Sequence, residues 1–141
     1  MLQEAPALEP TIFTRILRRE VPAAIVYEDE LTFAFMDAGQ LNPGHVLVAT
    51  RQQAETLLDI DEATAMALFR TVHRVAHAVQ AAFQPEGMTI LQANKVAGWQ
   101  TVPHLHVHVL PRHADDGVGL VWPRKNPSLD ELRRIAAQIR L

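Results

Sequence analysis

Hydrophobic residues recur at helical spacing in separate stretches of the chain. Between residues 61 and 83 they fall three and four positions apart, which predicts one long helix with a single apolar face. A shorter run that begins at Thr11 predicts an N-terminal helix ending at Val21-Pro22. Ser128 opens a capping box and predicts a last helix to about Ile139. The long helix should bury Leu68, Phe69, Val72, Val75, Ala76, Val79 and Phe83.

Shorter apolar segments, separated by turn residues, have the length of strands. Asn42-Pro43-Gly44 marks one such turn, and Pro85-Glu86-Gly87 ends the long helix. Because a proline cannot donate to a strand ladder, Pro111 should stop the last strand. The mixture of helices and closely spaced strands predicts an α+β fold with an antiparallel sheet of about five strands. The expected strands are 25–27, 31–36, 45–49, 88–92 and about 104–110.

The composition is that of one globular domain, and it excludes several kinds of chemistry. The 141 residues are 48% hydrophobic and 21% charged, with a formal charge of −3. We expect residues 1–10 to be flexible and 11–141 to form a single domain. The chain lacks the basic excess typical of nucleic-acid binding and any stretch apolar enough to span a membrane. The absence of cysteine excludes disulfides and thiol nucleophiles and is compatible with a cytoplasmic protein.

Three histidines alternate with aliphatic residues in the segment 103–111, Pro-His-Leu-His-Val-His-Val-Leu-Pro. Side chains of a strand alternate between its two faces, so His104, His106 and His108 should share one face. The aliphatic residues between them can then face the core. Three interpretations are open, namely an exposed polar face, a histidine metal site, and phosphate chemistry in which a neutral imidazole attacks phosphorus.

The residues just before this segment favour phosphate chemistry. Asn94, Gln100 and Thr101 are uncharged hydrogen-bonding groups, which suit phosphate oxygens. Gly98 allows a tight turn whose backbone N–H groups can bind an anion. These groups are poor metal ligands, and no carboxylate lies between residues 86 and 115 to complete a metal site. The metal interpretation therefore becomes the weaker one.

The alternating segment resembles the signature of the histidine-triad (HIT) superfamily of nucleotide hydrolases and transferases. The resemblance runs from about Thr11 to Arg112 and includes Pro43-Gly44-His45. The segment 97–102, Ala-Gly-Trp-Gln-Thr-Val, is similar to the family's phosphate loop. The opening residues are similar to the bacterial branch of histidine-triad nucleotide-binding proteins and nucleoside phosphoramidases. The transferases have glutamine where this chain has His108, so the resemblance implies a hydrolase. It also implies a homodimer in which the two sheets join.

The resemblance implies a role for each residue of the site. His106 would attack the α-phosphorus of a purine nucleotide and form a covalent nucleotidyl-histidine, and His108 would contact the phosphate. His104 and His45 would support them, and Asp37 would bind the ribose hydroxyls. A neutral imidazole is available at pH 7 because the ordinary histidine pKa is about 6.5. The implied phosphate contacts are Asn94, Thr101 and the backbone at Trp99, and Gln100 would lie near the leaving group. The implied base and ribose pocket is Ile12, Phe13, Ile16, Phe35, Met36 and Leu47.

The sequence departs from the family pattern at the metal-binding positions. Many bacterial members hold a structural zinc with two cysteines and two histidines. Thr11 and Thr14 stand at the cysteine positions, and Gln53 replaces one histidine, so only His104 of that quartet is present. We therefore expect no metal and no other cofactor. Trp99 stands where a small residue is common, and its indole could cover the phosphate loop or pack outward.

Several functions stay open at this point. The leading hypothesis is hydrolysis of a purine nucleoside phosphoramidate or a related adenylate through His106. A hydrolase of dinucleoside polyphosphates, of the diadenosine tri- or tetraphosphate type, would use the same nucleophile. A non-catalytic nucleotide-binding or interaction module would keep the pocket without turnover. A histidine-ligated metalloprotein is the remaining hypothesis. His73 and His77, one turn apart on the long helix, are expected on a solvated face.

Overall fold

The sequence folds around one antiparallel sheet. The computed structural model describes residues 8–141, and residues 1–7, part of the segment predicted to be flexible, lie outside the described residues. The strands in chain order are β1 (Ile25–Glu28), β2 (Thr32–Met36), β3 (Val46–Thr50), β4 (Gly87–Gln92) and β5 (His106–Arg112). The helices are α1 (Ile12–Leu17), α2 (Glu62–Phe83) and α3 (Leu129–Ala136), with short 3-10 helices η1 (Leu57–Asp59) and η2 (Val96–Gly98).

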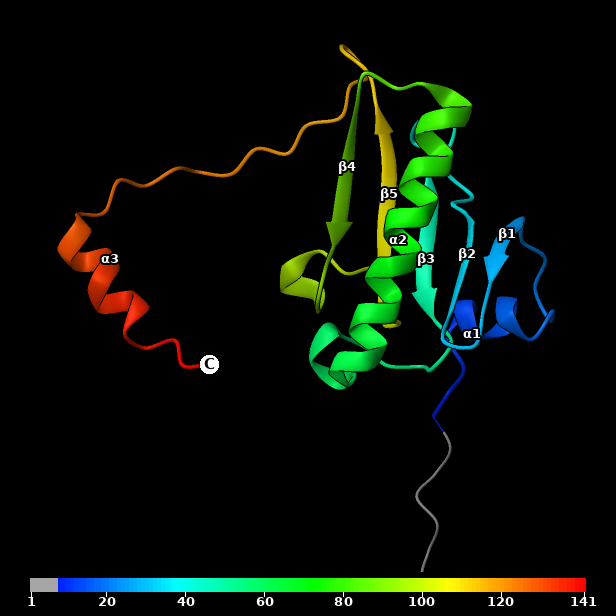
Figure 1. Ribbon diagram of the computed structural model, residues 1–141, viewed down its shortest axis with the longest axis horizontal. Helices are drawn as coiled ribbons and strands as arrows, with labels where there is room; N and C mark the ends of the chain where they lie inside the picture. The colour runs from blue at the N-terminus through cyan, green and yellow to red at the C-terminus, as the bar shows by residue number, and fades with distance from the viewer. Residues whose placement is uncertain (1–7) are drawn as a thin grey trace, which may run out of the picture.

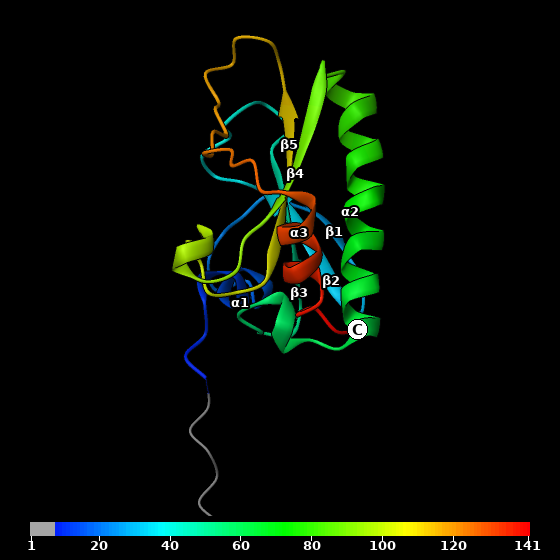
Figure 2. The ribbon, with the colours of Figure 1, turned by 90° about the vertical axis from the view of Figure 1, so that its left-hand side faces the viewer.

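The histidine strand β5 lies inside the sheet, between β3 and β4. The order is β1-β2-β3-β5-β4, and each neighbouring pair is antiparallel. The long helix α2 covers one face of the sheet, whereas α1 and η2 lie on the other (Figures 1 and 2). The predicted α+β class, the five-stranded sheet, the long helix and the shorter terminal helices are therefore confirmed.

Capping residues explain where the first two helices begin and end. The Thr11 side chain accepts a hydrogen bond from the first turn of α1, and the Asp61 side chain does the same for α2. The helix α1 ends at Leu17, earlier than predicted, because Arg19 has a φ of 62° and leaves the helical conformation. Gln84, in the left-handed conformation, ends α2.

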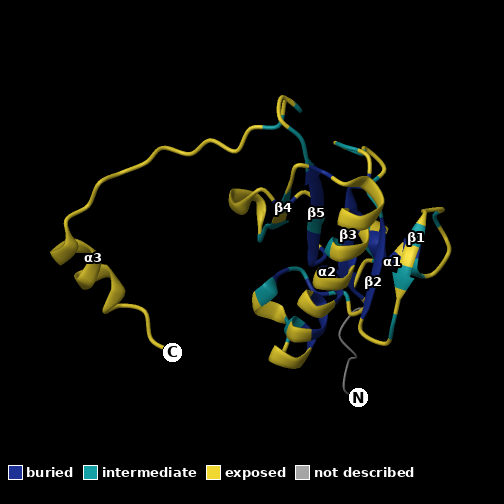
Figure 3. Cartoon of the chain, turned by 45° about the horizontal axis from the view of Figure 1, so that its top comes forward, coloured by how far each residue is buried: buried dark blue, intermediate teal, exposed yellow. Residues whose placement is uncertain are grey.

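Strand alternation divides the apolar residues between two cores. The central strands are buried along most of their length (Figure 3). The core beneath α2 contains Ala34, Val46, Val48, Leu68, Val72, Val75, Val79, Leu105, Val107 and Val109. The core beneath α1 contains Phe13, Ile16, Phe33, Phe35, Leu47 and Ala49. The aliphatic residues of the histidine segment thus face α2, as predicted. Phe69 and Phe83 were expected in the buried stripe of the long helix, but they are 44% and 45% exposed.

The prediction that Pro111 stops its strand is wrong. The strand β5 continues to Arg112, and Pro111 lies opposite Met88 of β4. The last residue pair between β5 and β3 is Val109 with Val46. Beyond that pair, β5 has left β3 and keeps β4 as its strand neighbour. A proline is tolerated where a strand has become an edge on one side.

The C-terminal residues 119–141 are exposed along their whole length. They extend from β5 and end in α3, which stands apart from the sheet (Figure 1). Ser128 accepts a hydrogen bond from the Glu131 N–H, as the capping box predicts. The helix ends at Ala136 and not near Ile139. The N–H groups of Gln138 and Ile139 donate to carbonyls three residues earlier, as in a 3-10 helix and not four residues earlier as in an α-helix. Among the described residues, no helix combines the length and hydrophobicity needed to cross a membrane.

Gly44 provides a test of how the α2 core is joined to the loop before β3. Its φ is +99°, and an added Cβ would lie 2.6 Å from a ring carbon of Phe83. We expect Gly44→Ala to lower the free energy of unfolding by about 1–3 kcal/mol, measured by urea denaturation. Gly119→Ala is the control, because an added Cβ there meets no described atom within 4 Å. Equal stability of the two variants would contradict this account.

Candidate active site

A cavity of about 430 Å³ opens on the α1 face of the sheet and reaches His106 and His108. Every residue predicted for the base and ribose pocket lines it, namely Ile12, Phe13, Ile16, Phe35, Met36 and Leu47. Asp37 and Thr101 add polar groups to the lining. The structure therefore brings most of the predicted nucleotide-binding residues together around two histidines of the triad.

Part of the cavity wall was missed in the sequence analysis. The turn between α1 and β1 contributes Val21, Pro22, Ala23 and Ala24, and Ala38 and Val102 also line the cavity. Four consecutive apolar residues in a connecting segment were a signal that this turn packs against something. In the sequence, Val21 and Pro22 predict only the end of the helix.

The backbone fixes the imidazole of His106. Its Nδ1 lies 2.6 Å from the carbonyl oxygen of His104. Because a carbonyl can only accept, Nδ1 carries the hydrogen and Nε2 keeps its lone pair. The ring of Phe13 packs edge-on against this imidazole, with centroids 4.9 Å apart and an interplanar angle of 87°. His106 lies opposite Ala49 of β3, whose small side chain leaves room for the ring.

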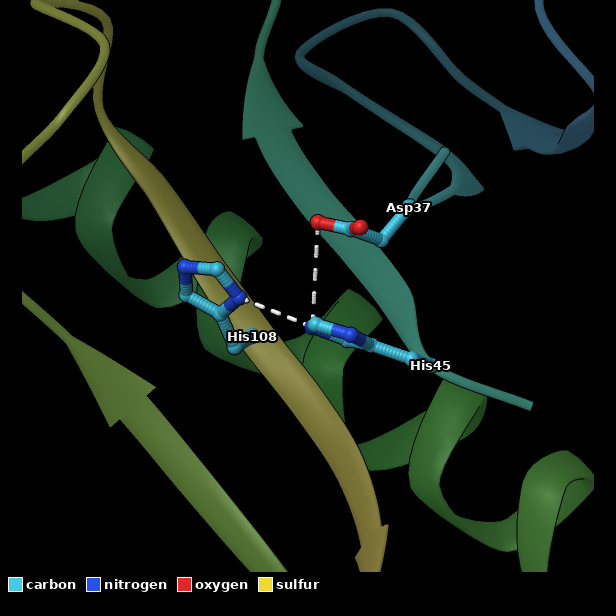
Figure 4. A group of neighbouring side chains, drawn as sticks. All are labelled: Asp37, His45 and His108. Atoms are coloured by element: carbon cyan, nitrogen blue, oxygen red, sulfur yellow. Dashed lines mark hydrogen bonds and ion pairs between the residues drawn. The ribbon is translucent and has the colours of Figure 1, made fainter. Parts of the chain in front are cut away.

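His108 belongs to a second polar group that includes His45 and Asp37 (Figure 4). The Nε2 of His45 lies 2.9 Å from the Nδ1 of His108 and 3.9 Å from the Oδ2 of Asp37. His45 follows Gly44 and is buried, and its Nδ1 has no hydrogen-bond partner within residues 8–141. His108 and Asp37 are half-buried and line the cavity.

The spacing of this second group also bears on metal binding. One ligand atom from each of Asp37, His45 and His108 lies within 4.8 Å of the others, which is close enough for a shared ion. Two imidazole nitrogens on a tetrahedral zinc would be about 3.3 Å apart, given Zn–N bonds of about 2.0–2.1 Å. The 2.9 Å separation here is that of a hydrogen bond between the rings. The group thus fits a hydrogen-bonded pair better than a metal site, and the absence of a cofactor stays a prediction.

Burial keeps the histidines of the site neutral. Loss of solvation lowers the pKa of His45, His104, His106 and His108 below the ordinary value. The pKa of His108 falls furthest, to about 4, because protonated His106 and His45 would also repel its charge. The carboxylate of Asp37 opposes this lowering at three of the four. The uncharged imidazoles needed for nucleophilic attack are therefore the stable form at pH 7.

Of the three interpretations of the histidine segment, the exposed polar face does not hold. His104 is fully buried and His106 is 6% exposed, because α1 covers this face of the sheet. His104 lies just before β5 and does not line the cavity. Its Nε2 donates to the Thr50 carbonyl at 2.7 Å, so the ring faces the protein interior.

Asn94, a predicted phosphate contact, and Gln100, predicted near the leaving group, both form hydrogen bonds that hold the loop containing η2. The Gln100 amide accepts from the Lys95 N–H at 2.7 Å and donates to the Glu55 carbonyl at 2.6 Å. The Asn94 side-chain oxygen accepts from the Leu57 N–H at 2.8 Å. Both side chains lie outside the cavity lining, whereas Thr101 lines it.

Trp99 closes η2 in the left-handed conformation, with a φ of 77°. Trp99 is 60% exposed, so most of its surface faces solvent. Its backbone N–H donates to the Val96 carbonyl at 2.9 Å. This N–H is therefore already bonded in the present conformation, and a phosphate contact through it would need the loop to rearrange.

The fold and the histidine arrangement agree with the comparisons with known proteins. Residues 18–115 match the HIT domain, and the chain therefore belongs to the HIT family. It is 36% identical over 115 residues to Protein hit of Bacillus subtilis, covering 81% of this chain and 79% of the relative. It is 35% identical over 103 residues to the purine nucleoside phosphoramidase of Escherichia coli, covering 72% and 87%. A crystal structure of a Bacillus subtilis HIT family member matches with a TM-score of 0.88 at 33% identity, covering 92% and 94%.

The lowered pKa values predict that acid destabilises the fold. Unfolded histidine binds a proton near pH 6.5, whereas folded His108 does so only near pH 4. The unfolded state binds more protons between these values, so the free energy of unfolding should fall as the pH drops from 6.5 to 4. His108→Gln removes one titrating group, so its free energy of unfolding should fall less steeply between pH 6.5 and 4. Urea denaturation at each pH measures this free energy. An equal slope for variant and wild type would contradict the assignment.

Proposed function

We propose that this protein hydrolyses a purine nucleoside phosphoramidate or a related adenylate, with His106 as the nucleophile. The observation that carries the proposal is the hydrogen bond from His106 Nδ1 to the His104 carbonyl. That bond leaves the Nε2 lone pair free on a neutral ring at the end of the cavity. Membership of the HIT family supports a nucleotide hydrolase, and the E. coli relative is named a purine nucleoside phosphoramidase.

The proposed reaction has two steps. The Nε2 of His106 attacks the α-phosphorus, and the bond from phosphorus to the leaving nitrogen breaks. That nitrogen takes a proton from the solvent and departs as the amine, and the nucleotide is then held covalently by His106. Water attacks the same phosphorus and releases a proton to the solvent, the bond to His106 breaks, and the nucleoside monophosphate leaves. Two half-reactions of this kind give ping-pong kinetics.

We assign His108 the role of hydrogen-bond donor to the phosphate. The carboxylate of Asp37, 3.9 Å from His45 Nε2, favours a hydrogen on that nitrogen. His45 then donates to the Nδ1 of His108, which leaves the hydrogen of His108 on Nε2. A neutral donor placed there can stabilise the negative charge that develops on the phosphate oxygens.

The shape and chemistry of the cavity support a nucleoside as its ligand. Its volume of about 430 Å³ lies within the range of small-molecule sites. The walls are largely apolar, which suits the faces of a purine and a ribose, and Asp37 offers an acceptor for the ribose hydroxyls. Mild base selectivity is expected, because an apolar slot holds the base mainly by its faces.

We also propose that the protein is a cytoplasmic homodimer joined through the edge of β4. The sequence of β4, Gly-Met-Thr-Ile-Leu-Gln, contains no charged residue and no proline, the features that protect free edges. Within residues 8–141, β5 is its one strand neighbour. Pairing with a second copy of β4 would satisfy that edge. The cytoplasmic location rests on the cysteine-free composition.

A turnover panel tests the enzymatic proposal. Wild type and His106→Ala should be assayed with adenosine 5′-phosphoramidate and with diadenosine tri- and tetraphosphates. We expect the wild type to prefer the phosphoramidate, and the variant to lose at least about 1,000-fold in kcat because the nucleophile is gone. A preference for the diadenosine tri- or tetraphosphate would favour the dinucleoside polyphosphate hydrolase. Binding of AMP without turnover would favour a non-catalytic module, and equal activity of the variant would exclude His106.

Light scattering coupled to size exclusion tests the dimer. We expect a mass of twice the 15.7 kDa of the chain. Ile90→Lys places a charge on β4 and should shift the protein towards monomer. Val26→Lys is the matched control, because it places the same charge on β1 at the other edge of the sheet. A monomeric wild type, or an equal effect of the two substitutions, would contradict pairing through β4.

A further inference from the structure

A cluster of hydrogen bonds lies behind the triad, outside the cavity lining. The Thr11 hydroxyl is 2.7 Å from the Nδ1 of His104, and the Thr14 hydroxyl donates to the Gln53 side-chain oxygen at 2.6 Å. The same oxygen accepts from the Thr11 N–H at 3.0 Å. The cluster joins the start of α1, the loop after β3 and the segment before β5, which are remote in sequence. We call Thr11, Thr14, Gln53 and His104 the polar cluster.

The hydrogen positions within the polar cluster follow from the acceptors. The Nε2 of His104 must donate to the Thr50 carbonyl, so its Nδ1 carries no hydrogen. The Thr11 hydroxyl must therefore donate to Nδ1, and this bond and the bond to Thr50 hold the ring at both nitrogens. His104 is fully buried, so losing either partner would leave a ring nitrogen without water to replace it.

The polar cluster reaches His106 by two routes. His104, whose ring it fixes, also supplies the carbonyl that accepts from His106 Nδ1 at 2.6 Å. The same bonds hold α1, and α1 carries Phe13, whose ring packs edge-on against the His106 imidazole. The acceptor and one wall of the His106 site therefore both depend on the polar cluster.

We propose that Thr11 and Gln53 are positioning residues for His106. Their hydrogen bonds hold His104 and α1 in place, and so keep the His106 Nε2 aimed into the cavity. Neither residue lines the cavity or touches the reacting atoms. The proposal rests on the function proposed above, in which His106 is the nucleophile. Small errors in the direction of a nucleophile reduce the rate of attack strongly while substrate binding is retained.

Thr11→Val is the direct test, because valine keeps the shape of threonine and removes the hydroxyl. With adenosine 5′-phosphoramidate as substrate we expect kcat to fall about ten-fold and KM to stay within about two-fold of wild type. Thr11→Ser restores a hydroxyl and should recover most of kcat. Gln53→Leu, on a half-buried loop residue, should reproduce the loss and serves as the second variant if Thr11→Val does not fold.

Thr71→Val is the matched control for a merely structural effect. Its hydroxyl lies 2.7 Å from that of Thr32, and Thr71 is more deeply buried than Thr11, but on the α2 side of the sheet. We expect it to lower stability without changing kcat in protein shown to be folded by circular dichroism. An unchanged kcat in both Thr11→Val and Gln53→Leu, or an equal fall in Thr71→Val, would overturn the proposal.

A spectroscopic measurement separates this proposal from the proposed function. The ring nitrogen NMR signals of His106 should report hydrogen on Nδ1 in the wild type and a mixture of both forms in Thr11→Val. This readout needs no substrate. If the wild type turns over no nucleotide, the proposed function fails, and the NMR comparison alone decides whether the polar cluster orients His106. Identical His106 signals in wild type and Thr11→Val would then reject the positioning role.

Discussion

The two-residue repeat of β5 is the constraint on which both halves of the molecule depend. Val107 and Val109 point to the α2 face and His106 and His108 point to the α1 face, because successive side chains of a strand must alternate. Because α2 covers one face of the sheet and α1 lies on the other, both faces of β5 are covered (Figure 2). The same strand thus completes a dry aliphatic core on one side and the candidate site on the other. A register slip of one residue would bury imidazoles against α2 and place valines in the cavity.

Burial on the α1 face gives the histidines properties that a surface strand could not. Desolvation disfavours their protonated forms, and each nitrogen that contacts a backbone carbonyl must carry the hydrogen. The protein therefore sets both the charge and the tautomer of His106 before any ligand arrives. The fixed ring also has little conformational freedom to lose when it reacts. Phe13 contributes to this arrangement by occupying the space beside the ring.

Local sequence patterns were sufficient for most of the elements. The caps at Thr11, Asp61 and Ser128 and the alternation in β5 follow from spacing over a few positions. The family resemblance supplied the apolar pocket residues and the role of each histidine, which spacing alone left open. The fold confirmed the resemblance, and the individual roles stay predictions.

Contacts between remote segments account for what the sequence did not predict. Gln100 bonds to the carbonyl of Glu55, 45 positions away, so its use as a loop brace has no local signal. Whether Pro111 ends a strand depends on where the pairing with β3 stops, at Val46, and not on the proline itself. The deep burial of His104 likewise depends on α1 lying across the sheet.

The polar cluster determines how the junction between α1 and the sheet responds to oxidation. It ties α1 to the sheet with hydroxyl, amide and imidazole groups, and the chain contains no cysteine. Such a tie has no thiolate that an oxidant could convert to a disulfide or a sulfenic acid. The junction therefore does not depend on the redox state of its surroundings.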